Sequence, residues 1–104
     1  MSKLNVCIAG LGNVGANLIS TIEKNCFLID EKCNLSINIL AISAQNKLKK
    51  RIFDINSYEW CEDPIDLIDI KDCNVLIELI GEEKGISYKL VKKALENKIH
   101  VVTA

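Results

Sequence analysis

Residues 4–15, with the sequence LNVCIAGLGNVG, decide the fold of this 104-residue chain. A short apolar run leads directly into Gly10, Gly12 and Gly15, which follow the pattern G-x-G-x-x-G. Gly10 permits a tight turn out of a buried strand, and Gly12 lets a phosphate approach the main chain because it has no Cβ. Gly15 allows the following helix to pack against the strand. The stretch therefore predicts a strand and helix that bind a dinucleotide.

The residues after these glycines predict the helix itself. Apolar residues recur there at helical spacing, namely Val14, Leu18, Ile19 and Ile22. The N–H groups at the start of such a helix, with the positive end of its dipole, form an anion site that needs no basic side chain. A purely structural turn is the alternative interpretation of the same glycines. Residues 25–34 show no firm period, so we expect the helix to break into a loop there.

The remainder of the chain predicts further strands and helices. Residues 35–43, 74–80 and 100–104 are rich in β-branched residues, and the first two runs are apolar on both faces toward their ends. Helical spacing recurs in residues 86–95, and Pro64 after Asp63 predicts a short helix with an aspartate cap. This order predicts an α/β fold, a Rossmann-type parallel sheet of about four strands with helices on both faces.

Length and composition limit the possible functions. We expect one domain, residues 1–104, because the chain is close to the commonest domain size. A net charge of −1 gives no reason to expect binding to nucleic acid or to a membrane surface. No run is long and apolar enough for a secretory signal or a bilayer span, so we expect a cytoplasmic protein. The odd number of cysteines, five, and their spacing predict reduced thiols and no metal site.

The end of the second strand bears on which nucleotide is bound. An acidic residue there favours NAD, whereas basic residues accommodate the 2′-phosphate of NADP. The chain has no carboxylate at this point but Ser43, Ala44 and Gln45, followed by four basic residues, Lys47, Lys49, Lys50 and Arg51. This favours NADP(H) over NAD(H), although the basic residues could equally form an ordinary solvated face.

Two other polar residues have alternative interpretations. Glu78 lies near the carboxyl end of the third predicted strand, where ligands bind in open α/β sheets, so it could face a cofactor. It could instead form hydrogen bonds at a subunit or domain interface, which we favour because an unpaired buried carboxylate is costly. His100 has no candidate acid, nucleophile or metal partner in the sequence, and we expect it to be structural.

Four ordered motifs together resemble the N-terminal cofactor domain of the homoserine dehydrogenase family. They are GLGNVG at the start, AIS with two polar residues after the second strand, VLIELIG in the third strand, and HVVTA at the end. In that family the last motif continues into Asn and Lys, one residue beyond the end of this chain. The resemblance covers essentially the whole sequence, including the YEWCEDP segment near residue 60.

The resemblance implies NAD(P)-linked interconversion of aspartate semialdehyde and homoserine, on the route to threonine and methionine. By position, the pyrophosphate would be held by the motif glycines with Leu11, Asn13 and Val14. The adenosine ribose would meet Ser43 to Gln45, and the nicotinamide side would be lined by Gly81 and Thr103. Gln45 stands where NADP-using members often carry Arg, and Glu82 replaces the second glycine common after ELIG.

The resemblance also implies what this chain would lack. The family's proton-transfer residues lie beyond the last residue of this sequence, so we expect no catalytic residues here and no homoserine turnover by the chain alone. The expected partners are the nicotinamide dinucleotide, a substrate domain and further copies of the chain in a homo-oligomer. Two alternatives remain open: a stand-alone regulatory module that senses NAD(P)(H), and the cofactor domain of another amino-acid or semialdehyde dehydrogenase.

Overall fold

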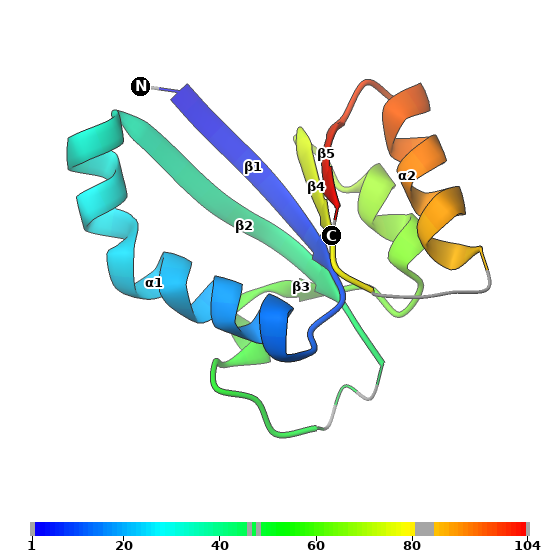
Figure 1. Ribbon diagram of the computed structural model, residues 1–104, viewed down its shortest axis with the longest axis horizontal. Helices are drawn as coiled ribbons and strands as arrows, with labels where there is room; N and C mark the ends of the chain where they lie inside the picture. The colour runs from blue at the N-terminus through cyan, green and yellow to red at the C-terminus, as the bar shows by residue number, and fades with distance from the viewer. Residues whose placement is uncertain (1, 46, 48, 81–84, 104) are drawn as a thin grey trace.

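The computed structural model describes residues 2–45, 47, 49–80 and 85–103. Its centre is a parallel sheet of five strands in the order β3-β2-β1-β4-β5 (Figure 1). The strands are β1 (Ser2–Ala9), β2 (Leu35–Ser43), β3 (Glu59–Trp60), β4 (Val75–Glu78) and β5 (His100–Thr103). The helices are α1 (Asn13–Cys33) and α2 (Ile86–Glu96), with two short 3-10 helices, η1 (Ile55–Ser57) and η2 (Pro64–Asp69).

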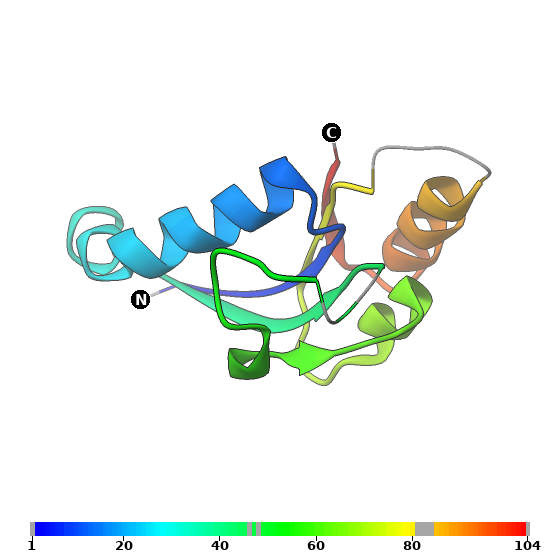
Figure 2. The same cartoon turned by 90° about the horizontal axis from the view of Figure 1, so that it is seen from below.

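The helices cover both faces of the sheet, as Figure 2 shows, with α1 on one face and α2 with η2 on the other. Successive side chains of β1 point to opposite faces, so they contribute to two hydrophobic clusters, one on each side of the sheet. Val6 and Ile8 pack with Ile19 of α1, whereas Cys7 packs with Leu90 of α2. Because residues 6–9 of β1 are buried on both faces of the sheet, this half of the strand is a continuous apolar run rather than an alternating one.

Most of the predicted elements are confirmed. The second strand has the predicted bounds, and η2 begins at Pro64 with the Asp63 carboxylate accepting a hydrogen bond from the Ile65 N–H at 3.0 Å. The predicted break in residues 25–34 is wrong, because α1 continues to Cys33. The sheet also contains β3, a strand of two residues, which is too short to show any periodicity in the sequence.

The carboxyl ends of the strands lie along one edge of the sheet, and β1 is at its centre. Beyond the end of β1, the Gly10 N–H donates to the Ser43 carbonyl at 2.8 Å. On the other side, the Leu79 N–H donates to the Ala9 carbonyl at 2.7 Å. The backbones that follow β1, β2 and β4 are therefore held together beside the start of α1. Among the described residues, none of the helices has the length and hydropathy needed to span a membrane.

Candidate functional site

A cavity of about 690 Å³ opens at the carboxyl ends of β1, β2 and β4. It contains backbone of the glycine turn, the end of β2 and the segment after β4, which the topology brings to one edge. Its described lining is Gly10, Leu11, Gly12, Ser43, Ala44, Gln45, Lys49, Arg51, Glu62, Pro64, Leu79, Ile80 and Ile86. Six of the residues that the sequence predicted for nucleotide binding therefore lie together in this lining.

Two of the three motif glycines are required by packing. Gly10 has φ +101°, and a Cβ placed there would lie 2.6 Å from the carbonyl carbon and oxygen of Leu79. A Cβ on Gly15 would lie 2.2 Å from the Gly10 carbonyl oxygen. Because both residues lack a Cβ, the first turn of α1 and the segment after β4 can pack directly against the end of β1. This geometry agrees with the roles predicted for both glycines in the turn and in helix packing.

Gly12 differs from the other two, because a Cβ there would have no atom of the described chain within 4 Å. Gly12 is the N-cap of α1, with φ −71°, and no side chain caps the helix. The N–H groups in the first turn of a helix have no partner within the helix, and the helix dipole adds positive potential. The open space at Gly12 and these donors together form a cradle suited to an anion.

The other predicted residues of the helix start lie outside the cavity lining. Asn13 and Val14 are exposed in the first turn of α1, and Gly15 is buried against the glycine turn. The Asn13 and Val14 side chains do not line the described cavity and Gly15 has no side chain, so only the backbone groups of these three residues could serve an anion at this position. Gly81 lies outside the described residues.

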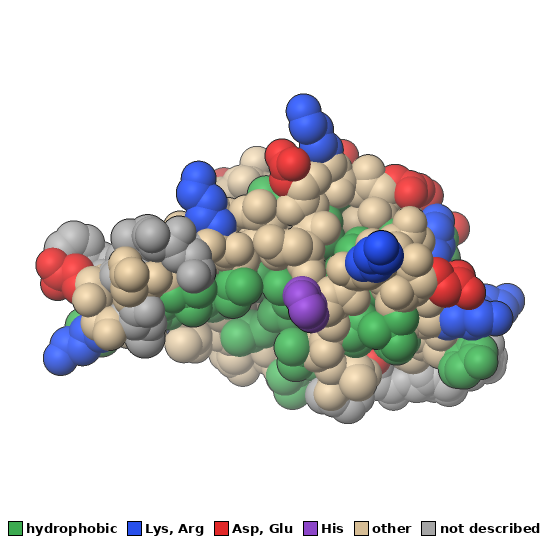
Figure 3. Space-filling model, turned by 90° about the horizontal axis from the view of Figure 1, so that it is seen from above, with side chains coloured by type: hydrophobic (Ala, Val, Ile, Leu, Met, Phe, Trp, Pro, Cys, Tyr) green, Lys and Arg blue, Asp and Glu red, His purple; other side chains and the backbone are tan. Residues whose placement is uncertain are grey.

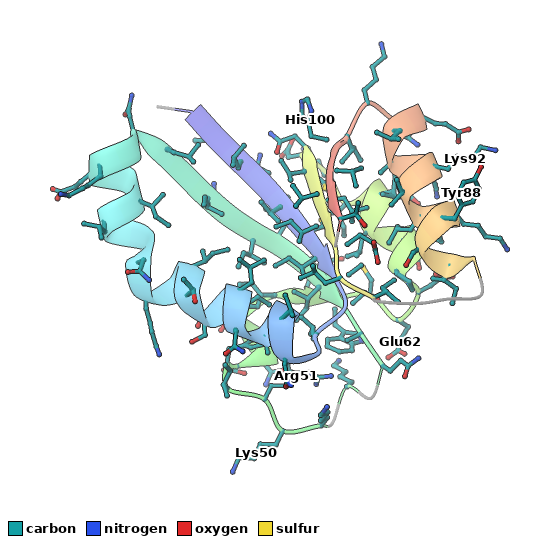
Figure 4. The ribbon with its side chains drawn as sticks, viewed as in Figure 1. Lys50, Arg51, Glu62, Tyr88, Lys92 and His100 are labelled. Atoms are coloured by element: carbon teal, nitrogen blue, oxygen red, sulfur yellow. The ribbon has the colours of Figure 1, made fainter. Side chains whose placement is uncertain are left out.

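The four basic residues after β2 lie in different environments. Lys49 and Arg51 line the cavity, whereas Lys50 points away from the fold (Figure 4). The Lys47 ammonium lies over the Trp60 ring, 5.9 Å from its centroid. The interpretation as an ordinary solvated face therefore applies to Lys50. Lys49 and Arg51, by contrast, lie where they could contact a ligand in the cavity.

Glu78 is buried inside the domain and is 2 % exposed. Its carboxylate accepts hydrogen bonds from the Ile80 N–H at 2.9 Å, from the Ser87 hydroxyl at 2.8 Å and from the Thr103 hydroxyl. It thus joins β4, α2 and β5. These contacts favour a structural role, but within the domain rather than at the interface that we expected. Thr103 is held by the same carboxylate at the end of β5.

His100 begins β5 on the surface, labelled in Figure 4, and its N–H donates to the Asn74 carbonyl at 3.0 Å. This backbone bond extends the pairing of β4 and β5. It agrees with the expected structural role.

A second hollow, of about 320 Å³, lies away from the strand ends. Residues from the middle of β2 and from α1 line it with Tyr58. The Tyr58 hydroxyl donates to the Glu23 carboxylate. Burial, followed by this hydrogen bond, raises the pKa of Tyr58. Since this hollow contains no glycine turn or helix start, the cavity at the strand ends is the better candidate site.

Sequence reasoning missed several residues of the cavity. Glu62 and Pro64 follow β3, and Leu79 and Ile80 follow β4; they lie in segments quoted for the resemblance, but none of them was assigned to the nucleotide. Their position after the strands could have identified them, because residues just beyond the carboxyl end of each parallel strand lie together at one edge of the sheet. For the segment after β3, that signal was hidden because the strand itself was not predicted.

No family model matches the chain. Curated relatives do, each called homoserine dehydrogenase: one from Neisseria gonorrhoeae is 34 % identical over 104 residues, and one from Bacillus subtilis is 31 % identical. Both alignments cover 100 % of this chain, but 23 % and 24 % of the relatives. The chain therefore spans about a quarter of the length of these relatives.

Solved structures give the same result. A crystal structure of S. aureus homoserine dehydrogenase at pH 7.0 matches with a TM-score of 0.88 and 34 % identity, over 100 % of this chain and 26 % of that one. A homoserine dehydrogenase from Thiobacillus denitrificans matches with a TM-score of 0.81 and 25 % identity, over 99 % of this chain and 23 % of that one. The parallel sheet with its helices is thus a Rossmann-type α/β fold.

Proposed function

Because this chain matches the N-terminal domain of homoserine dehydrogenase over its whole length, we propose that residues 1–104 form that enzyme's NAD(P)-binding domain. The observation that carries the proposal is the cradle at Gly12. Open space there faces the start of α1, beside a cavity at the carboxyl ends of three parallel strands. In folds of this type the pyrophosphate of a dinucleotide binds at such a helix N-terminus.

The two ends of the dinucleotide are assigned from the cavity lining. Ser43, Ala44 and Gln45 follow β2, on the side where the adenosine ribose binds in this fold. Leu79 and Ile80 follow β4 on the other side of the glycine turn and offer an apolar wall for the nicotinamide. Thr103 lies at the end of β5, next to β4, where Glu78 fixes its hydroxyl.

We further propose that NADP(H) is preferred to NAD(H). The cations Lys49 and Arg51 lie in the same lining as the Ser43–Gln45 segment, and the end of β2 carries no carboxylate. A 2′-phosphate would gain from such positive charge. Glu62 also lines the cavity, but its carboxylate accepts a hydrogen bond from the Trp60 indole N–H at 3.2 Å.

The activity proposed for the whole enzyme is the NAD(P)-linked interconversion of homoserine and aspartate semialdehyde. The name shared by the matched relatives supports it, since a dehydrogenase transfers hydride to or from a cofactor of this type. On this proposal the chain supplies the cofactor half, and a substrate domain supplies the proton-transfer groups. The regulatory module is not favoured, because the matched proteins are named as enzymes.

The proposal is tested by calorimetric titration of the chain with NADPH and NADH, beside a Gly12→Val variant. The fold should tolerate the substitution, because Gly12 has an extended backbone with φ −71° and open space around a Cβ. The valine side chain would occupy the position of the phosphates, so binding should weaken by about tenfold or more. Lys50→Met is the matched control and should bind like the parent. Unchanged binding by a folded Gly12→Val variant would contradict the phosphate cradle.

A further inference from the structure

Arg51 uses the edge of its guanidinium to hold the backbone of its own loop. One terminal nitrogen donates to the Lys47 and Lys49 carbonyls, at 3.3 and 3.1 Å, and the other donates to the Gln45 carbonyl at 2.9 Å. A guanidinium is planar, and its N–H groups all point outward within that plane. Three of its five N–H groups are therefore directed at carbonyls of the loop, and the guanidinium also has a flat surface on either side that can face other groups.

The guanidinium group also lies over the Trp60 ring. The central carbon of the Arg51 guanidinium is 5.5 Å from the centroid of the Trp60 ring, within the range of a cation–π contact. Trp60 in turn is fixed by packing in the core with Phe53 and by its indole hydrogen bond to Glu62. The guanidinium thus contacts an aromatic ring that is itself held in place by packing and a hydrogen bond.

The same residue lines the cavity together with Ser43 and Gln45, on the side assigned to the adenosine ribose. We propose that Arg51 is the stacking surface for the adenine ring: the base lies on the guanidinium face opposite Trp60. This inference rests on the proposed function. Guanidinium planes and nucleobases stack well, because the positive plane attracts the π face of the base and both are flat.

The arrangement has a consequence for the 2′-phosphate. Because three N–H groups of Arg51 are directed at carbonyls, we assign its face to the base and the flexible Lys49 ammonium in the same lining to the phosphate. A lysine at position 51 would keep the charge but lose the plane. Arg51→Lys is therefore a severe change at this site although it conserves charge.

The test is solution NMR on the isotopically labelled 104-residue chain with NADPH. We expect nuclear Overhauser contacts between the adenine H2 and H8 protons and the δ-methylene of Arg51. Trp60 is the only tryptophan, so its single indole N–H resonance should also shift on binding. Arg51→Lys should weaken NADPH and adenosine 2′,5′-bisphosphate binding by about tenfold, the order of one lost stacking contact. Lys50→Met removes one positive charge from the same loop and should leave both affinities unchanged.

The outcomes separate the two proposals. Saturable NADPH binding with adenine contacts to other residues, and none to Arg51, would overturn the stacking surface and leave the proposed function standing. Equal loss of affinity in Arg51→Lys and Lys50→Met would also overturn it, since the loss would then not depend on a planar guanidinium at position 51. An absence of any NADPH binding would overturn the proposed function and this inference with it.

Discussion

At the scale of single residues, the three glycines of the motif are in two different environments. Gly10 and Gly15 are required because the main chain of the turn, of α1 and of the segment after β4 approach within contact distance. Among the described residues Gly12 has no such neighbour, so packing does not account for its lack of a side chain, which on the proposed function leaves room for the phosphates. The motif predicts all three positions, but only the distances distinguish the two packing glycines from the glycine that we propose to contact the ligand.

Substitution of Gly10 should therefore affect stability, whereas substitution of Gly12 should affect binding. In Gly10→Ala a Cβ would lie 2.6 Å from the Leu79 backbone at φ +101°, and we expect a loss of about 2 kcal/mol or more in the free energy of unfolding. Gly12→Ala, in open space, should change it by less than about 1 kcal/mol. Urea denaturation of both variants measures the difference, and equal losses would contradict it.

The thiols Cys7 and Cys73 give the protein a pH dependence. A hydrogen bond from the Cys7 thiol lowers the pKa of Cys73 to about 7, against desolvation by burial, which acts in the opposite direction. The same hydrogen bond, followed by burial, raises the pKa of Cys7. Burial also raises the pKa of Cys61. The thiolate of Cys73 is thus favoured in the folded state, and the other two thiols stay protonated there.

The sign of the effect follows from proton binding. Between pH 7 and 9, Cys73 is ionised when folded but protonated when unfolded, so the unfolded state binds more protons and stability rises with pH. This contribution is lost as the pH falls through about 7. Above about pH 9, Cys7 and Cys61 ionise only on unfolding and reverse the trend. Unfolding of the reduced protein should cost on the order of 1 kcal/mol more at pH 8.5 than at pH 7, after discounting for solvent. A Cys73→Ser variant that keeps the whole rise would refute this assignment.

At the scale of elements, the sequence predicts the bounds of helices and strands well where apolar residues recur at a regular spacing, and poorly where they do not. The bounds of β2 and the cap of η2 follow from periodicity and from Asp63 before Pro64. The end of α1 does not, because its last turns carry mixed charged and apolar residues, and the helix stops at Asn34 in a left-handed conformation with φ +51°. Asparagine is common at such a stop, but its signal is weak beside that of glycine.

The end of α2 provides a test at this scale. The Lys98 N–H donates to the Leu95 carbonyl at 3.0 Å and the Ile99 N–H to the Ala94 carbonyl at 2.9 Å, a pattern that ends many helices. Lys98 itself has φ +61°, which favours glycine. Lys98→Gly should raise the free energy of unfolding by about 0.5–1 kcal/mol in chemical denaturation. Lys98→Ala keeps the Cβ and should show no gain; an equal gain would assign the effect to the lost charge.

At the scale of the whole molecule, the site exists because the parallel topology brings distant segments to one edge. That edge could be predicted from the order of strands and helices, and so could the Ser43–Gln45 segment beside the glycine turn. The loop of Arg51 and Trp60 could not, because its geometry depends on side-chain contacts with carbonyls and on a strand of two residues. Several large apolar side chains are exposed among the described residues, and Figure 3 shows hydrophobic surface beside His100.

The length of the chain relative to its matches leads to the last prediction, on turnover. Hydride transfer requires a substrate held against the nicotinamide and a group that moves the hydroxyl proton. The chain spans 23 % of the Neisseria relative, and its described cavity is lined by the glycine turn and strand ends that we propose to bind a dinucleotide. The purified chain should therefore bind NADPH in calorimetry yet show no homoserine-dependent formation of NADPH, followed by the absorbance of the reduced nicotinamide. Full-length S. aureus homoserine dehydrogenase in the same assay is the positive control. Turnover by the chain alone would mean that proton-transfer groups lie within these 104 residues.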